Sequence, residues 1–191
     1  MQNNQDYSGE FPTVNAAKTN NTILSDVGGV AIVASLWNGW ASGSDLRIIA
    51  PSALEPFTNS PTIFLVRKDL IDDGTIKTIA DLKGKTVAVA GGPGSGSEYL
   101  AAKALERGGV TIFDVTMLNI GNADMPVAFE NKSIDAGLLG SPYAENVVDG
   151  GFATAFEKDI TPGLMTVTFV GSGKFINERS EVAQRFVLAL Y

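Results

Sequence analysis

Short apolar runs alternate with amphipathic stretches along most of the chain, a pattern that predicts strands followed by helices. The β-branched run TVAVA at residues 86–90 predicts a strand. Residues 98–107 predict a helix, because four apolar residues recur on one stripe at helical spacing. Gly108 and Gly109 follow directly, and glycine is common just beyond the end of a helix. This part of the chain therefore predicts a strand, a glycine-rich loop and a helix.

The same alternation continues towards the C-terminus. VTMLNIG, IDAGLL and FATAF predict strands, and DMPVAFEN and SPYAENVVDGG predict helices, the second with Pro142 in its first turn. Strands that alternate with helices at this spacing indicate βαβ units and a mostly parallel sheet. We therefore expect an α/β protein.

An internal similarity bears on the domain organisation. Residues 20–50 and 131–156 share an order of features: a polar turn, a strand with an aspartate, a small-residue break, a helix, a glycine turn and a strand. This order indicates two similar lobes, although two unrelated βαβ units would share it as well. Residues 51–61 carry three prolines and little periodicity, which predicts a linker. We expect a first lobe over residues 1–61, completed by 172–191, and an inserted second lobe over residues 62–171.

Two segments would connect these lobes. The run TIFLVRKD, directly after the linker, predicts a strand that passes between them, and MTVTFVGSGKFIN near the C-terminus predicts a second extended run. SEVAQRFVLALY then opens a helix with Ser180 as its N-cap. Two crossings between two lobes suit closure about a hinge.

The composition limits the possible functions mainly through the residue types that the sequence lacks. The net charge of −7 leaves no basic stripe that would bind nucleic acid. The chain has no Cys and no His, which removes thiolate nucleophiles, serine–histidine pairs, disulfides and nearly every zinc, copper or non-haem iron site. Any catalysis would have to depend on carboxylates, Lys or Tyr.

Membrane and export signals are also missing from these residues. No apolar run reaches the roughly 18 residues that span a bilayer. The first residues, MQNNQDYSGE, lack the basic and apolar parts of a signal peptide. A mature, processed or trimmed chain would have this appearance.

The stretch AVAGGPGSGSEY at residues 88–99 is the strongest candidate for a binding site. The chain leaves the carboxyl end of a strand and enters a helix, where the first amides lack partners and the helix dipole is positive. Ser95 and Ser97 add hydroxyl donors, and Gly94 and Gly96 let the backbone approach a ligand closely. This arrangement suits a carboxylate, sulfonate or phosphate. The alternative is a merely flexible turn in which Ser95 or Ser97 caps the helix.

Nucleotide-binding and hydrolase motifs do not fit this stretch. A Walker loop needs Gly-Lys-Ser/Thr, but Gly96 is followed by Ser97 and Glu98. A dinucleotide fingerprint lacks the acidic residue expected at the end of the next strand, which ends in NIG. The Gly-x-Ser-x-Gly elbow is missing because Pro93 lies two residues before Ser95, and no His is available as a base.

Further polar loops follow other predicted strands, and in a parallel sheet they would share the edge of the glycine loop. In NIGNADM, Asn119, Asn122 and Asp124 are candidate contacts of a polar solute, although Asp124 is equally placed to cap the next helix. In GSPY, Ser141 is a candidate contact or an N-cap. Tyr143 in the same loop is a candidate contact or an aromatic residue at the edge of the core.

Several segments of the sequence together resemble a known protein family. They are TIADLKGKTVAVAGGPGSGSEYLAAKALERGGV, NIGNADMPVAFENKSIDAGLLGSPYAENVVDGG and, in the first lobe, ILSDVGG and GSDLRIIAP. They are similar to the solute-binding proteins of nitrate/sulfonate/taurine-type ABC importers, a family related to thiamine-precursor binding proteins. The similarity covers most of the chain.

This resemblance implies a periplasmic-binding-protein type II fold, in which two hinged lobes hold a solute between strand-end loops. It implies capture of a small anionic solute, delivery to a membrane permease, and a periplasmic or membrane-anchored extracellular location, with no covalent chemistry, catalytic residue or cofactor. Carried over by position, residues 94–97 would form the anion pocket, and residues 119–124 and 141–143 would line the same lobe. Gly28 and Gly29, in the corresponding loop DVGG of the first lobe (residues 26–29), and Val30 directly after it would face them.

The chain also departs from the family pattern. Family members begin with a further strand, loop and helix before the region matching FPTVNAAKTNN, and they continue beyond RFVLALY. We therefore expect a fragment whose first lobe is incomplete, with an unpaired sheet edge that invites dimerisation.

Other functions and solutes stay open at this point. The same fold forms effector domains of transcription regulators, and a related enzyme class makes thiamine precursors with His and Cys, which this chain lacks. Glycine and serine donors suit many anions, whereas Asp124 would favour an amine-bearing solute.

Overall fold

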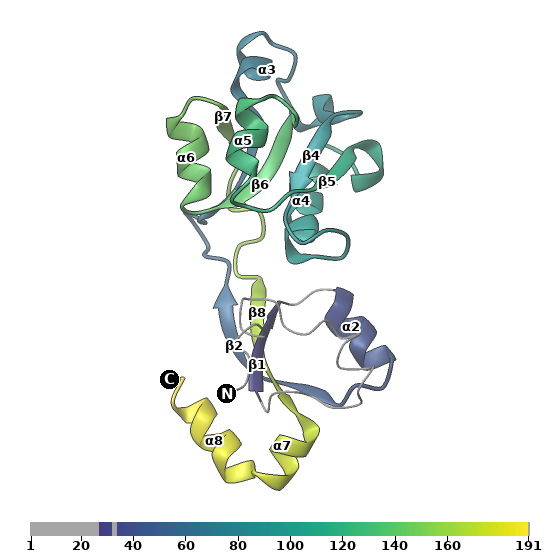
Figure 1. Cartoon of the computed structure of the whole chain (residues 1–191), viewed down its shortest axis with the longest axis vertical. Coiled ribbons are helices and arrows are strands. Elements are labelled where there is room, and N and C mark those ends of the chain that lie inside the picture. The colour runs from purple at the N-terminus through teal and green to yellow at the C-terminus, as the bar shows by residue number, and fades with distance from the viewer. Residues whose placement is uncertain (1–26, 32–33, 191) are drawn as a thin grey trace. The chain divides into compact units, whose positions relative to one another are not determined.

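The computed structural model describes residues 27–31 and 34–190, which fall into two compact units (Figure 1). Unit 1 comprises Met1–Leu54 and Met165–Tyr191, and unit 2 is Glu55–Leu164. The boundaries expected from the sequence, after residues 61 and 171, fall several residues later than these junctions. The reason is that two strands of unit 1 stay paired as far as Leu54 and Met165.

The described part of unit 1 is a small antiparallel sheet with helices. Its sheet has the order β1-β8-β2, and both outer strands are antiparallel to β8. The first and second strands thus run in the same direction, as in a βαβ unit, but β8 separates them. The expectation of parallel pairing is therefore wrong for this unit. Its elements are β1 (Val27–Ala31), α2 (Ala34–Ala41), β2 (Leu46–Leu54), β8 (Met165–Ser172), α7 (Gly173–Glu178) and α8 (Ser180–Leu188).

Two local expectations fail in unit 1. The first four residues of the expected linker are strand, because β2 continues through Pro51 to Leu54. Proline is tolerated there because β2 is an outer strand of the described sheet and its register shifts on both sides of Pro51. Ser180 does not cap α8, since the N-cap position is Arg179 and no side chain caps that end.

Unit 2 is a five-stranded sheet with helices between its strands. The strand order is β5-β4-β6-β3-β7, with parallel β4–β5 and β4–β6 pairs and antiparallel β3–β6 and β3–β7 pairs. Four strands thus point in one direction, as the sequence predicts, and β3 alone is reversed. Its elements are β3 (Thr62–Arg67), α3 (Lys68–Asp72), η2 (Ile79–Leu82), β4 (Thr86–Val89), α4 (Gly96–Glu106), η3 (Ile112–Asp114), β5 (Thr116–Asn119), α5 (Met125–Glu130), β6 (Ala136–Gly140), α6 (Tyr143–Asp149) and β7 (Ala153–Glu157).

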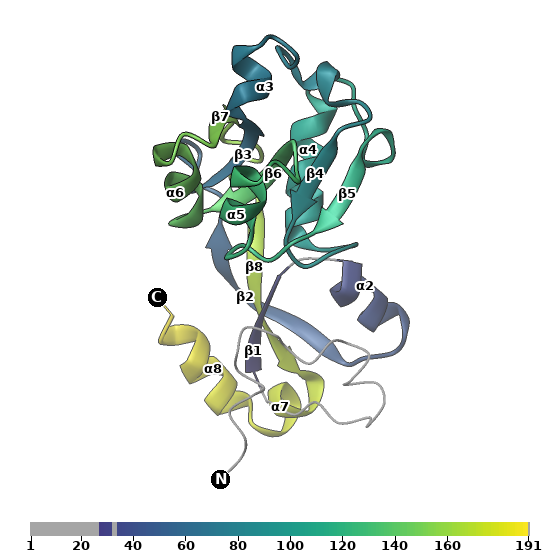
Figure 2. The same ribbon diagram turned by 45° about the horizontal axis from the view of Figure 1, so that its top comes forward.

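The reversed strand β3 has a buried centre. Its four central residues are buried, and they alternate between the two faces of the sheet. Phe64 and Val66 join a core cluster with Leu100 and Leu105 of α4, whereas Leu65 joins a second cluster with Phe129 of α5. The helices therefore cover both faces of this sheet (Figure 2). TIFLVR consequently lies inside unit 2, and the expectation that it passes between lobes is wrong.

The end of α4 agrees with the sequence prediction. The helix stops at Glu106, and Gly109 adopts a φ of +68°, which glycine reaches without strain. Gly108 also approaches η2 so closely that a Cβ there would lie 2.4 Å from the Cβ of Ile79. Among the helices of the described residues, none is long and apolar enough to cross a bilayer.

Candidate functional site

Three loops of unit 2 meet at one edge of its sheet, and we call them the strand-end loops. They follow β4, β5 and β6, at residues 90–95, 120–124 and 141–142. Because β5 and β6 both pair with β4 in parallel, the carboxyl ends of these three strands share an edge. A backbone hydrogen bond from Ile120 to the carbonyl of Val89 (3.1 Å) holds the first two loops together. Ligands of open α/β sheets collect at such an edge.

The glycines after β4 give their loop a shape that other residues would strain. Gly91, Gly92 and Gly94 have φ values of +88°, +69° and +78°. Gly92 also lies close to the end of β5, since a Cβ added at Gly92 would be 3.3 Å from the side-chain nitrogen of Asn119. The glycines thus serve a close backbone approach between two strand ends.

Ser95 is the N-cap of α4. Its Oγ accepts a hydrogen bond from the Glu98 amide (3.1 Å) and donates one to the carbonyl of Ala90 (3.1 Å). The bond accepted from Glu98 is the capping alternative that the sequence left open, and the hydroxyl hydrogen is used inside the loop.

Glu98 is a residue of this loop region that the sequence-based site omits. Its Oε2 accepts a hydrogen bond from the Gly94 amide at 2.6 Å. The local signal was present, because Ser95 and Glu98 have the spacing of a capping box. In a standard capping box the carboxylate would accept from the amide of the N-cap residue, Ser95. Here it accepts from the amide of Gly94, one residue earlier.

Two amides at the start of α4 remain open. The backbone N–H groups of Gly96 and Ser97, and the Ser97 hydroxyl, donate to no acceptor within the described residues. All four residues at positions 94–97 are half-buried. The first amides of an α-helix carry partial positive charge, so this pair is suited to an anionic group.

The second strand-end loop is exposed. Asn119, Asn122 and Asp124 all lie at the surface. Asp124 occupies the N-cap position of α5, but its side chain makes no capping hydrogen bond. Its carboxylate is therefore available to a solute.

In the third loop, Ser141 is tied to the helix that follows. Its hydroxyl donates a short hydrogen bond to the Glu145 carboxylate, which lowers the pKa of Glu145 below its ordinary value. The N-cap position of α6 is Pro142, so the N-cap alternative for Ser141 is wrong. Tyr143 is half-buried and packs against the core cluster around Phe129, as the core-edge alternative expects.

The candidate residues of unit 1 lie in a strand. Gly28, Gly29 and Val30 belong to β1 and pair with residues of β8, so the expected loop DVGG is wrong at Gly28 and Gly29. The strand forms because β8, far along the chain, supplies its partner. Asp26 lies outside the described residues. That Gly28, Gly29 and Val30 face the strand-end loops stays a prediction.

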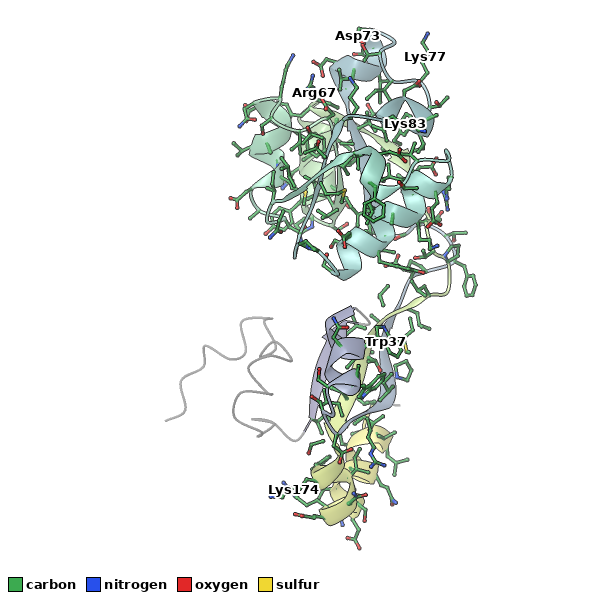
Figure 3. The ribbon with its side chains drawn as sticks, turned by 90° about the vertical axis from the view of Figure 1, so that its right-hand side faces the viewer. Trp37, Arg67, Asp73, Lys77, Lys83 and Lys174 are labelled. Carbon is green, nitrogen blue, oxygen red and sulfur yellow. The ribbon has the colours of Figure 1, made fainter. Side chains whose placement is uncertain are left out.

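Charge differs between the two edges of the unit 2 sheet. Residues 90–98, 119–124 and 140–145 include three carboxylates and no Lys or Arg. Arg67, at the end of the reversed strand β3, lies at the opposite edge and pairs with Asp69 (2.7 Å). Figure 3 shows Arg67, Lys77 and Lys83 together at one end of unit 2. The described residues include no cluster of His, Cys, Asp and Glu that would hold a metal ion.

Unit 1 contains an open groove of a different kind. Its volume is about 500 Å³, and it lies along β2, α7 and α8. The walls are mainly aliphatic, and no charged side chain lines them, so the groove has little to bind an anion. The lining residues are Ile49, Ile176, Ser180, Ala183, Gln184, Val187 and Leu188.

Solved structures share the fold of this chain. The alkanesulfonate-binding protein SsuA from Xanthomonas axonopodis pv. citri, bound to MOPS, superimposes with a TM-score of 0.68 at 24% identity, over 91% of this chain and 55% of that one. The periplasmic aliphatic sulphonate binding protein SsuA from Escherichia coli gives a TM-score of 0.71 at 23% identity, over 94% and 58%. These likenesses confirm the expected periplasmic-binding-protein type II fold.

Sequence comparison identifies the family. The chain is 33% identical over 103 residues to a protein of Escherichia coli (strain K12) provisionally named as aliphatic sulfonates-binding, covering 54% of this chain and 30% of that one. It is 26% identical over 160 residues to a binding protein of Brucella abortus, likewise provisionally named, and covers 50% of its length. This chain thus spans half or less of these relatives. Residues 39–191 match the family model described as NMT1/THI5 like, and the chain therefore belongs to the NMT1/THI5-like family.

Proposed function

We propose that this chain is the solute-binding component of an ABC importer and that it captures a small solute with an anionic group. One observation carries the proposal: the open amides of Gly96 and Ser97 stand at the sheet edge where proteins of this fold class collect ligands. The names of the relatives favour a sulfonate as the anionic group.

The amides at the start of α4 supply the anion site in this proposal. A sulfonate has three oxygens that accept hydrogen bonds, so it can take both open amides together with the Ser97 hydroxyl. The eleven-residue helix adds its positive end. Ser95 contributes by holding the loop rather than by donating its hydroxyl hydrogen.

The rest of the solute would meet the other strand-end loops. Asn119 and Asn122 offer amide donors and acceptors, and Tyr143 offers an aromatic edge. We also propose that β1 of unit 1 contributes contacts to the solute. The proposed site comprises Gly94, Gly96, Ser97, Asn119, Asn122, Asp124, Ser141 and Tyr143, with Ser95 holding the loop and Gly28, Gly29 and Val30 from unit 1.

Partners and location follow from the same proposal. The loaded protein would deliver its solute to a membrane permease, without covalent chemistry, in the periplasm or anchored to the outer side of a membrane. Copies would associate through an outer strand of the unit 1 sheet, which ends at β1 and β2 in the described residues.

A binding screen tests the proposal. Ethanesulfonate, nitrate and sulfate are titrated into the 191-residue protein by calorimetry, and thermal unfolding is followed in parallel. We expect saturable one-to-one binding of the sulfonate and a melting temperature that rises with its concentration. Heat changes no larger than those of the buffer, with no shift in melting temperature for any of the three anions, would overturn the proposed function.

A further inference from the structure

Two chain segments connect unit 2 to unit 1, and they are bonded to each other where they enter unit 2. We call residues 55–62 and 157–164 the junction segments, because the first begins and the second ends at the unit boundary. The Glu55 amide donates to the carbonyl of Leu164 (2.8 Å), and the Gly163 amide donates to the carbonyl of Glu55 (2.9 Å). The two segments are therefore paired directly at the boundary.

A buried serine extends this connection further into unit 2. Ser60 is only 5% exposed. Its hydroxyl donates to the Glu55 carboxylate (2.7 Å) and accepts from the Thr62 amide (3.1 Å). Its own amide donates to Oδ1 of Asp159 (2.7 Å). Ser60 thus joins the first junction segment to the second and to the start of β3.

Both junction segments contain residues in unfavourable states. Asn59 and Asp159 have φ values of +59° and +50°, a region that is uncommon outside glycine and persists where surrounding contacts maintain it. The hydroxyl of Thr161 is buried and has no hydrogen-bond partner within the described residues. The second junction segment is therefore held by its contacts rather than by its local preferences.

Arg107, directly after α4, makes four of these contacts. Its guanidinium donates to the carboxylate of Glu157. It also donates to the carbonyls of the next three residues, Lys158 (3.3 Å), Asp159 (2.8 Å) and Ile160 (3.1 Å). A guanidinium carries five donors in a rigid plane, so one side chain can bind four consecutive residues. The end of α4 and the second junction segment are consequently fastened together.

We propose that Arg107 is a positioning residue for the hinge between the two units. It binds the second junction segment to α4, and Ser60 binds the first segment to the second, so both segments move with unit 2. Bending is then confined to the few residues at the unit boundary. Without Arg107, the left-handed backbone at Asp159 loses its restraint and the chain can also bend inside unit 2. This role is independent of any solute.

Hydrogen exchange measures whether Arg107 restrains the second junction segment. In Arg107→Gln we expect the amides of residues 157–164 to exchange roughly 10- to 100-fold faster than in the wild type, the factor of one hydrogen bond to a charged group. Lys103→Gln is the matched control, because it removes a positive charge near the same end of α4, where Lys103 pairs with Glu106 (2.7 Å). It should exchange as the wild type does. Unchanged exchange in Arg107→Gln would overturn the proposal.

Distances between spin labels test the hinge itself. The sequence has no Cys, so pairs of introduced cysteines can be labelled specifically. Glu181→Cys with Asn146→Cys measures between the units, and Lys77→Cys with Asn146→Cys measures within unit 2; all three residues are exposed. In Arg107→Gln we expect the distance distribution between the units to broaden, while the distribution within unit 2 keeps its wild-type width. Lys103→Gln should keep both widths.

Each other outcome overturns the proposal. An unchanged distribution between the units in folded Arg107→Gln protein, judged by circular dichroism, would show that Arg107 does not limit the hinge. Broadening of both distributions would show that Arg107 only stabilises unit 2, and equal broadening in Lys103→Gln would assign the effect to charge. If Arg107→Gln does not fold, Arg107→Lys takes its place, since an ammonium group cannot span four acceptors, and the same outcomes decide.

Discussion

Replacing Gly96 by proline removes one open amide of the proposed anion site and little else. Proline is favoured at the first position of a helix, which Gly96 occupies in α4. The residue before a proline must be extended, and Ser95 already has φ −76° and ψ 162°. The variant therefore keeps the loop and the helix while it deletes a donor that no described residue uses.

The expected loss of affinity follows from that one donor. A hydrogen bond to a charged group contributes about 1.5–3 kcal/mol, so Gly96→Pro should weaken ethanesulfonate binding roughly 10- to 100-fold. Stability should change little or rise by about 0.4–1 kcal/mol, because proline restricts the unfolded chain. Calorimetry measures the binding, and urea unfolding measures the stability.

Gly96→Ala is the matched control, since it adds a methyl group but keeps the N–H. We expect it to bind ethanesulfonate within about threefold of the wild type, less than the loss of one neutral hydrogen bond. A folded Gly96→Pro protein with wild-type affinity would refute the reasoning, because the amide would then make no contact with the solute. Equal losses in both variants would point to crowding by added atoms instead.

Other predictions concern the fold around the site. Ser95→Ala removes the cap of α4 and should cost about 0.5–2 kcal/mol in urea unfolding; an unchanged midpoint would contradict the capping role. Gly92→Ala should cost about 1–2 kcal/mol, because its φ of +69° lies in the left-handed region. Hydrogen bonds from Arg67 and Lys132 hold the pKa of Asp69 at about 2, so its contribution to stability is present above pH 4 and is lost as the pH falls towards 2. Lys132→Met should raise that pKa in an NMR titration, and an unaltered titration curve would count against the pair.

The sequence predicted those parts of unit 2 that local patterns control. The strand at 86–90, the helix starting near Glu98 and the glycines at its end all lie within a few residues of β4, α4 and Gly109. Hydrophobic periodicity and the backbone preferences of glycine depend on residues close together in the sequence, so both can be predicted from the sequence alone. The shared edge of the three loops also followed, because βαβ connections place parallel strand ends together.

Features that depend on strands far away in the sequence could not be predicted from local patterns. TIFLVR is apolar enough to be a strand in any sheet, and only its pairing with β6 and β7 makes it the reversed strand of unit 2. Gly28 and Gly29 suggested a loop, but β8 holds them in a strand from more than a hundred residues away. Local glycine preference was overridden by tertiary pairing.

The side-chain hydrogen bonds of the site could be predicted from the sequence only in part. The spacing from Ser95 to Glu98 was readable as a capping box, and it would have assigned the Ser95 hydroxyl to the helix instead of the solute. The position of the Glu98 carboxylate on the Gly94 amide was not readable, because it depends on the positive φ of Gly94.

The central claim is that the first amides of α4 receive the anionic head of a solute. A titration of the uniformly ¹⁵N-labelled protein with ethanesulfonate, followed by the amide resonances, tests it most directly. We predict that the signals of Gly96 and Ser97 shift the most and saturate together, while that of Gly108, just beyond the far end of the same helix, stays in place. Saturable shifts confined to other residues, such as those lining the unit 1 groove, with Gly96 and Ser97 unmoved, would contradict the claim.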